Sequence, residues 1–368
     1  MTNLKARFNG KRANIKVVGV GGGGGNAINR MVDAKIGGVD FLALNTDAQD
    51  LRRNLAPYRC QLGENLTKGL GVGGDPDRGR AAAEESMEQI KQLVGDADLL
   101  FITAGMGGGT GTGAAPVIAR VAREAAGADV LLIGVVTRPF DFEGHERMRQ
   151  AQEGINAMRS HVDSLLVIPN EKLFDIIDRN TPTKEAYKMA DDVLRQAVQG
   201  ISEVITTPGE VNVDFNDVRR IMSKSGEALI GIGQSASATR HTDAARMAVS
   251  SPLLENASLE GAKGLIVHFL ASEHKAYEQR EAVEFIKERA SRDAMIKYGL
   301  VYDDTMGSTL RITVIATGFE RADAVASAAK KRRLPMTPGF DDFSPVREAG
   351  EGADNILIPA YIRRRRIR

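Results

Sequence analysis

The chain has 368 residues, 42% of them hydrophobic and 26% charged, which predicts two folded domains and excludes a wholly disordered protein. Its 49 basic residues (Lys and Arg) against 48 acidic ones give a net charge of +1, which excludes a protein that coats nucleic acid. A single cysteine, Cys60, excludes an internal disulfide, and the lack of a long apolar run excludes a membrane span and a signal peptide. We therefore expect a soluble, unexported protein of the reducing cytoplasm.

The first predicted elements alternate between strand and helix. Residues 15–20 are apolar and β-branched, as in a buried parallel strand, and five consecutive glycines (21–25) follow them. Asn26 then opens a segment with apolar residues at helical spacing. Residues 41–44 predict a second strand, which ends in residues 45–47 (Asn-Thr-Asp). This order is typical of an α/β protein.

The same alternation continues along the chain. A loop with several glycines at residues 67–76 precedes a predicted long amphipathic helix at 78–94. Residues 98–104 predict another buried strand, and a second glycine cluster at 105–113 leads into a helix. Residues 130–136 predict a further strand. Strands that alternate with helices in this way predict a parallel, doubly wound sheet.

A long helix separates this region from one of different character. Residues 183–205 place apolar side chains on one face without an internal helix breaker. Beyond it, a loop and helix at 211–222 are followed by predicted strands at 264–270, 295–301 and 310–317 and a helix at 277–289, which together predict a smaller α+β domain. We expect six regions: a flexible N-terminal segment 1–14, an N-terminal domain 15–182, a connecting helix 183–206, a C-terminal domain 207–319, a flexible linker 320–354 and a terminal peptide 355–368.

Both glycine clusters are typical of anion-binding loops. Residues 19–24 match the pattern G-x-G-x-x-G after a strand and before a helix, where glycine lets backbone N–H groups approach phosphate oxygens. A nicotinamide-dependent oxidoreductase shares this pattern, and a tight strand-to-helix connection without a ligand is a further alternative. Residues 107–113, which include two threonines, supply a second such loop at the same sheet edge. An oxidoreductase has no use for a second loop, whereas a nucleoside triphosphate does, and no Walker-type lysine follows either loop.

Several motifs carry a family resemblance. Residues 107–113 (GGGTGTG) resemble the signature of the tubulin superfamily. Other segments resemble, within it, the FtsZ family of bacterial cell-division GTPases; they lie at residues 20–27, 45–47, 69–71, 140–144, 212–215 and 251–254. The resemblance runs from about residue 15 to residue 319 and returns in the last residues. It implies a tubulin/FtsZ-like fold, GTP and GDP as ligands, and head-to-tail protofilaments that form the division (Z) ring at mid-cell.

The resemblance also implies which residues bind the nucleotide. Those against the phosphates are Gly22, Gly23, Gly24, Gly25, Asn26, Gly109, Thr110 and Gly111, with Asn45 and Gly73 completing the pocket. Glu143 and Arg147 are implied to bind ribose and phosphate; without the resemblance, their spacing of four predicts only a surface ion pair on a helix. Mg²⁺ is implied on the phosphates, although the sequence shows no carboxylate cage or histidine pattern that would hold a metal.

The guanine base is implied to lie against the long helix. The carboxylate of Asp191 is able to accept hydrogen bonds from both guanine N1–H and N2–H, which adenine does not offer. Tyr187 lies one turn earlier, where its ring is placed to stack on the base. Asp192 follows directly, so which of the two carboxylates binds the base stays open.

The predicted catalytic residues are Asp214 and Asp217, supported by Asn212. From the sequence alone, Asp214 is equally well explained as the N-cap of a helix that begins near Phe215. In the family, this segment enters the GTP pocket of the next subunit and polarises the attacking water, so hydrolysis would require assembly. A filament protein that binds GTP without hydrolysing it is the alternative, and it would need one of the two carboxylates to be lost.

The end of the chain predicts a partner-binding peptide. Residues 356–362 are apolar, and five more arginines follow them. They resemble the family's C-terminal peptide, which binds membrane-tethering and regulatory division proteins. The membrane would be reached through such a partner or through the arginines. The linker before the peptide has a typical reach of only about 30 Å.

Overall fold

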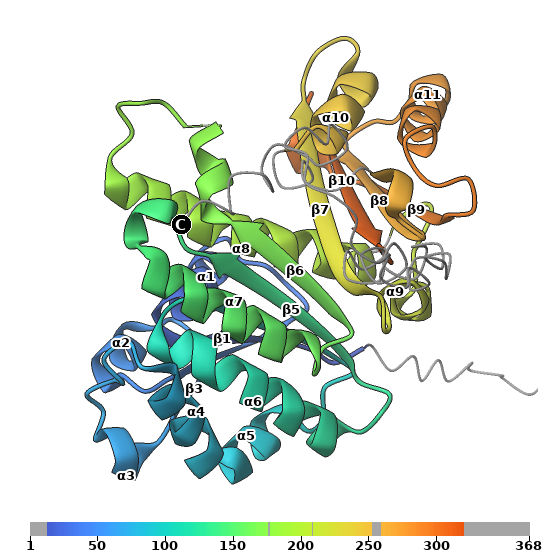
Figure 1. Cartoon of the computed structure of the whole chain (residues 1–368). Coiled ribbons are helices and arrows are strands. Elements are labelled where there is room, and N and C mark those ends of the chain that lie inside the picture. The colour runs from blue at the N-terminus through green and yellow to red at the C-terminus, as the bar shows by residue number, and fades with distance from the viewer. Residues whose placement is uncertain (1–12, 176, 208, 252–258, 320–368) are drawn as a thin grey trace, which may run out of the picture. The chain divides into compact units, whose positions relative to one another are not determined.

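The computed structural model of the chain describes residues 13–175, 177–207, 209–251 and 259–319. In these residues ten strands form one sheet in the order β3-β2-β1-β4-β5-β6-β7-β10-β8-β9 (Figure 1). The predicted linker 320–354 and terminal peptide 355–368 lie outside the described residues, as does nearly all of the predicted N-terminal segment 1–14.

The strands confirm the predicted α/β class with a parallel sheet. Neighbouring strands from β3 to β7 pair in parallel, β10 is antiparallel to both β7 and β8, and β9 is parallel to β8. The strands are β1 (Ile15–Val20), β2 (Asp40–Asn45), β3 (Tyr58–Gln61), β4 (Leu99–Gly105), β5 (Leu131–Arg138), β6 (Ser164–Pro169), β7 (Gly226–Ser235), β8 (Gly264–Ala271), β9 (Met295–Tyr302) and β10 (Leu310–Thr317).

Helices follow most of the strands. The α-helices are α1 (Gly21–Asp33), α2 (Ala48–Arg53), α3 (Glu64–Thr67), α4 (Pro76–Glu85), α5 (Met87–Val94), α6 (Gly109–Ala126), α7 (His145–Arg159), α8 (Thr183–Thr206), α9 (Phe215–Met222), α10 (Arg240–Val249) and α11 (Ala276–Lys287). Short 3₁₀ helices are η1 (Asp141–Glu143), η2 (Asn170–Asp175), η3 (Leu259–Gly261) and η4 (Asp304–Met306). No helix of the described ranges is long and apolar enough to cross a membrane.

Both faces of the parallel sheet are covered by helices, as a doubly wound sheet requires. Strand β1 is buried along its whole length, and its alternating side chains enter two different apolar clusters. On one face Val17 packs with apolar side chains of α1 and α8, and on the other Val18 packs with those of α4, α5, α6 and α7 (Figure 1). A third cluster joins α10 and α11 to β8 and β10. The apolar stripe predicted for the long helix is the buried face of α8.

Three predicted helices differ in their bounds from those observed. The single helix predicted at 78–94 is two helices, α4 and α5, which meet at Ser86. The Ser86 hydroxyl accepts a hydrogen bond from the Gly63 backbone N–H at 2.9 Å, a contact with a residue distant in the sequence. The helix predicted to open at Asn26 begins five residues earlier, at Gly21, and α6 begins inside the second glycine cluster, at Gly109. The glycines therefore form the first turns of two helices.

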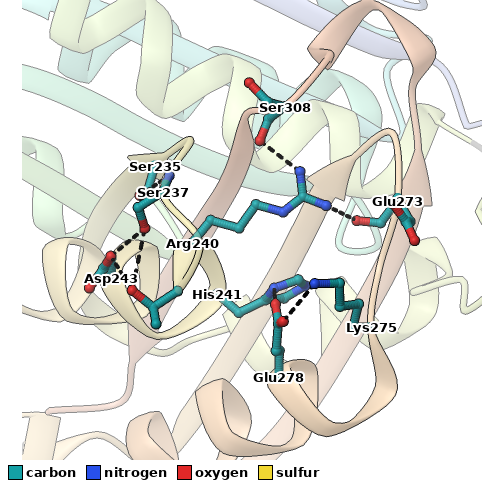
Figure 2. A network of polar contacts seen from close by, with 10 residues as sticks. Ser235, Ser237, Arg240, His241, Asp243, Glu273, Lys275, Glu278 and Ser308 are labelled. Atoms are coloured by element: carbon teal, nitrogen blue, oxygen red, sulfur yellow. Dashed lines mark hydrogen bonds and ion pairs between the residues drawn. The ribbon is translucent and has the colours of Figure 1, made fainter.

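A polar network joins α10 to the loops around β8 and β10 (Figure 2). The Arg240 guanidinium donates to the carbonyl oxygens of Ser308, at 2.6 Å, and Glu273, at 2.8 Å. Next to it, His241 Nδ1 lies 2.7 Å from Glu278 Oε2 on α11. Burial lowers the pKa of His241, whose ring is fully inaccessible. This network fixes the N-terminal end of α10 against α11.

A second buried histidine, His268 on β8, predicts acid sensitivity. Burial lowers its pKa to about 4, and its Nε2 atom has no hydrogen-bond partner among the described residues. Between pH 6.5 and 4 the unfolded chain binds a proton there that the folded chain does not. The free energy of unfolding should therefore fall as the pH falls, by about 3 kcal/mol at pH 4 for this group alone.

Urea unfolding at pH 7.5, 6, 5 and 4.5 checks this expectation. His268→Gln should show a smaller loss of stability at low pH than the unchanged protein does. The matched control is His145→Gln, at an exposed position, and it should retain the full loss. An equal loss in all three proteins would contradict the role given to His268.

Candidate functional site

The two glycine clusters meet at the carboxyl edge of β1 and β4. These strands are parallel neighbours, so the helices that follow them, α1 and α6, begin side by side. A Cβ on Gly21 would lie 3.0 Å from the Gly111 backbone nitrogen and 3.3 Å from the Thr110 Cβ atom. The first-turn N–H groups of a helix lack intrahelical acceptors and attract anions. Both predicted phosphate-binding segments thus present such groups at one place.

The loop at residues 69–75 packs against the second glycine cluster and against Thr46, which follows β2. Its Gly71 N–H donates to the Thr46 carbonyl at 3.2 Å, and its residues Val72 and Asp75 lie against Gly109. The hydroxyls of Thr46 and Thr110 are 2.6 Å apart. A Cβ on Gly73 would meet no atom of the described chain within 4 Å, so this part of the loop is open.

A cavity of about 220 Å³ lies beside the first glycine cluster. Four predicted nucleotide-binding residues line it: Gly22, Gly25, Asn26 and Asn45. The Asn45 amide donates to the carboxylate of Asp50 at 3.3 Å, and Asp50 also lines the cavity. The structure thus groups residues from α1, β2 and α2 around one pocket.

Glu143 and Arg147 form the ion pair that their spacing predicts. Their side chains are 2.6 Å apart, with the carboxylate 5% exposed and the guanidinium 51% exposed. Glu143 also accepts a hydrogen bond from the Phe140 N–H at 2.9 Å, which fixes its orientation. The backbone of Arg147 lies against Gly107 in the second glycine cluster. The half-exposed guanidinium therefore lies near the phosphate-binding loops.

Tyr187 belongs to a group of aromatic rings near this ion pair. Its ring lies edge-on to Phe140, with centroids 5.4 Å apart, and Phe142 and Phe174 pack on the same Phe140 ring. Tyr187 remains 39% exposed. An exposed ring with fixed neighbours is suited to stack on a planar base.

The structure distinguishes the two adjacent carboxylates of α8. Asp191 pairs with Arg30 of α1 at 3.4 Å, whereas Asp192 pairs with Arg195 of its own helix at 2.6 Å. Burial raises the pKa of Asp191 to about 6, although the charge of Arg30 opposes this shift. Asp191 therefore faces α1, the helix that begins in the first glycine cluster, whereas Asp192 pairs along its own helix.

The predicted catalytic residues lie at the opposite edge of the sheet. Asp214 and Asn212 line a cavity of about 770 Å³ together with Ile15, the first residue of β1, and the C-terminal end of α8. The glycine loops follow the last residue of β1, about 20 Å away for six strand residues. Within one chain, the structure does not bring the acidic residues to the phosphate-binding loops.

Each predicted catalytic side chain has a partner within the chain. Asp214 caps α9 by accepting a hydrogen bond from the Asp217 N–H at 2.8 Å, so the N-cap suggested by the sequence is formed. The Asn212 side chain accepts from the Gly209 N–H at 2.6 Å. The Asp217 carboxylate pairs with Lys297 of β9 at 2.8 Å.

Several residues of the site were not predicted. Arg30 and Asp50 contact predicted residues but belong to no motif. Arg138 is the last residue of β5 and Asn170 follows β6, and each has a buried side-chain atom without a hydrogen-bond partner in the described part of the chain. Recognising β6 as a strand would have placed Asn170 at this edge. No group of three metal-binding side chains occurs in the described residues.

Two adjacent glycine-rich helix N-termini at one edge of a parallel sheet are suited to bind phosphates, as in a nucleotide-binding protein. Residues 14–178 match the model of the Tubulin/FtsZ family, GTPase domain, and residues 226–320 match that of the FtsZ family, C-terminal domain. An empty FtsZ dimer from M. jannaschii is 44% identical with a TM-score of 0.79, and the match covers 84% of this chain and 89% of that one. The chain belongs to the FtsZ family, whose GTPase domain implies GTP and GDP as ligands.

Other solved structures agree with this assignment. A point mutant of FtsZ from M. jannaschii is 45% identical, with a TM-score of 0.79 and coverage of 84% of this chain and 92% of that one. The GTPγS-bound protofilament of CetZ2 from Haloferax volcanii has 21% identity and a TM-score of 0.71, covering 87% and 97%. At that identity the likeness extends to the fold alone.

The pKa of Asp191 predicts how GTP binding depends on pH. Only the ionised carboxylate accepts both guanine N–H groups, and it is protonated as the pH falls through about 6. GTP affinity should therefore be about tenfold weaker at pH 5 than at pH 7. Fluorescent GTP titrations from pH 5 to 8 measure this.

The neighbouring carboxylate supplies the control. Asp191→Asn should bind GTP weakly at every pH, with a flat profile. Asp192→Asn should keep the pH dependence of the unchanged protein. If instead Asp192→Asn gave the flat profile and Asp191→Asn kept the pH dependence, the base-binding role would belong to Asp192.

Proposed function

We propose that this protein hydrolyses GTP and assembles head to tail into protofilaments that form the cytoplasmic division ring at mid-cell. GTP bound by one subunit would be hydrolysed with the acidic segment of the next. A dimer is recorded for the FtsZ of M. jannaschii, which is similar to this chain over most of its length. We further propose a GTP-binding domain at 15–182, a connecting helix at 183–206 and a C-terminal GTPase-activating domain at 207–319.

The separation of the two halves of the site supports this proposal. The phosphate-binding loops follow the carboxyl end of β1, whereas Asp214 lies beside its amino end. Residues at opposite edges of one subunit become neighbours when identical subunits stack in one direction. A head-to-tail arrangement is therefore the simplest way to unite them.

The proposed roles follow from the chemistry of each group. The free N–H groups in the first turns of α1 and α6 would bind the phosphates. The proposed phosphate-binding residues are Gly22, Gly23, Gly24, Gly25, Asn26, Gly109, Thr110 and Gly111, of which Gly25 and Asn26 lie in the second turn of α1. Asp214 and Asp217 would orient the attacking water, with Asn212 in support. Mg²⁺ on the phosphates would offset their charge, and the oxygens of Thr110 and Asp50 beside the loops suit such a cation.

Asp214→Asn tests the catalytic role without removing the helix cap. Asn caps helices about as well as Asp but carries no charge, so α9 should stay folded. We expect at least a hundredfold loss of GTP turnover, with GTP affinity unchanged. In the unchanged protein, GTP turnover per subunit should rise with protein concentration. When the variant is mixed with the unchanged protein, turnover should fall by more than dilution alone would cause.

A second N-cap provides the matched control. Asp303 caps η4 through the Thr305 N–H at 2.9 Å, and Asp303→Asn should keep normal turnover. Normal turnover in Asp214→Asn would refute the catalytic assignment. GTP binding and filament formation without turnover in the unchanged protein would favour the alternative of a filament protein that does not hydrolyse GTP.

We also propose that residues 355–368 bind membrane-tethering and regulatory division proteins. This segment and the linker 320–354 lie outside the described residues, so the support is the apolar stretch at 356–362 and the arginines after it. Deleting residues 356–368 should leave GTP turnover and pelleting of filaments intact. Recruitment to liposomes that carry a tethering protein should be lost, and a loss of polymerisation instead would contradict this role.

A further inference from the structure

Strand β9 supports the acidic segment, which we define as residues 209–217. Val211 exchanges two backbone hydrogen bonds with Leu300, at 2.9 and 3.4 Å. Val213 packs on Gly299: a Cβ atom on this glycine would lie 3.3 Å from the Cγ2 atom of Val213. The segment is therefore held along β9 by backbone pairing and by close packing on a glycine.

A third contact between the same elements involves charge. The Lys297 ammonium of β9 lies 2.8 Å from Asp217 Oδ1, and the two side chains are 39% and 26% exposed. Asp214 instead accepts a hydrogen bond from the backbone at the start of α9. The two predicted catalytic carboxylates thus have different partners: in the described part of the chain, Asp217 pairs with a cation, whereas Asp214 accepts a backbone hydrogen bond.

We propose that Lys297 is a positioning residue for Asp217. Its ammonium holds the carboxylate in one orientation on α9 and offsets the charge of one of the two predicted catalytic carboxylates, Asp214 and Asp217, as they approach a neighbouring subunit's triphosphate. This inference rests on the proposed function, because it requires the acidic segment to dock against bound GTP. Lys297 acts through Asp217 and does not itself touch the substrate.

The physical reason is like-charge repulsion at a partly dehydrated contact. Two carboxylates approach a triphosphate when the subunits dock, and such charges repel more strongly as water leaves the contact. A cation already paired with one carboxylate reduces this repulsion before docking. Lys297 lies on β9, remote from the glycine loops of its own chain, so its loss should weaken subunit docking and leave GTP binding within a subunit unchanged.

Lys297→Met tests the charge, since it keeps the length of the side chain. The critical concentration for assembly, measured by pelleting with a slowly hydrolysed GTP analogue, should rise about three- to tenfold. GTP affinity below the critical concentration and the thermal unfolding midpoint should stay as in the unchanged protein. Lys297→Arg should remain within about twofold. Lys91→Met is the matched control, because Lys91 pairs with Glu88 at the same 2.8 Å with a 36% exposed side chain.

A double-mutant cycle separates positioning from a general structural effect. Asp217→Asn removes the charge that Lys297 pairs with, so adding Lys297→Met should then change the critical concentration by less than twofold. An equal rise in both backgrounds would overturn the proposal, as would a Lys297→Arg variant as impaired as Lys297→Met.

The Asp214→Asn variant distinguishes this inference from the proposed function. Normal turnover in that variant would overturn the proposed function and this inference with it. Lost turnover in Asp214→Asn, together with a Lys297→Met protein that assembles normally, would overturn only the role of Lys297.

Discussion

Direct contact between backbones, without intervening side chains, determines the geometry of the nucleotide edge. A Cβ on Gly24 would clash with the Thr103 carbonyl of β4, and one on Gly111 would lie 2.5 Å from the Gly105 carbonyl. Helices α1 and α6 therefore approach the ends of β1 and β4 more closely than any residue with a side chain permits. Their N-termini converge as a result, and backbone amides supply the positive potential that a P-loop lysine supplies elsewhere.

The sequence predicts best the elements that are buried on both faces. Strands β1 and β10 were predicted with the observed bounds, because β-branched residues dominate both segments and single polar residues, such as Lys16 and Arg311, do not end the pattern. Strand β3 was missed because its first two residues are exposed and polar or aromatic, and β7 because glycines interrupt its pattern. The break at Ser86 depends on Gly63, 23 residues away, which no local pattern encodes.

In the candidate site, too, local patterns were predicted from the sequence, and contacts between residues far apart in the chain were missed. Glycine clusters and short acidic motifs are visible in the sequence, and the structure places those of the nucleotide pocket together. Arg30 was missed because its partner, Asp191, is 161 residues away. Helix α8 explains how such distant residues are related: Asp191 lies in its first half, and Glu203, about 18 Å further along, lines the cavity that Asp214 also lines. One helix thus sets the spacing between the proposed base-binding residues and the acidic segment.

The backbone pairing between Val211 and Leu300 has a consequence for the solubility of the sheet. Strand β9 ends the sheet, and a strand in that position offers unpaired N–H and C=O groups to any other extended chain. The acidic segment occupies part of this edge, and Lys297 adds a charge to it. Subunits that are crowded together, as in the proposed filament, are therefore less able to pair through the free edge of β9. Contacts between copies would then form on other surfaces of the subunit.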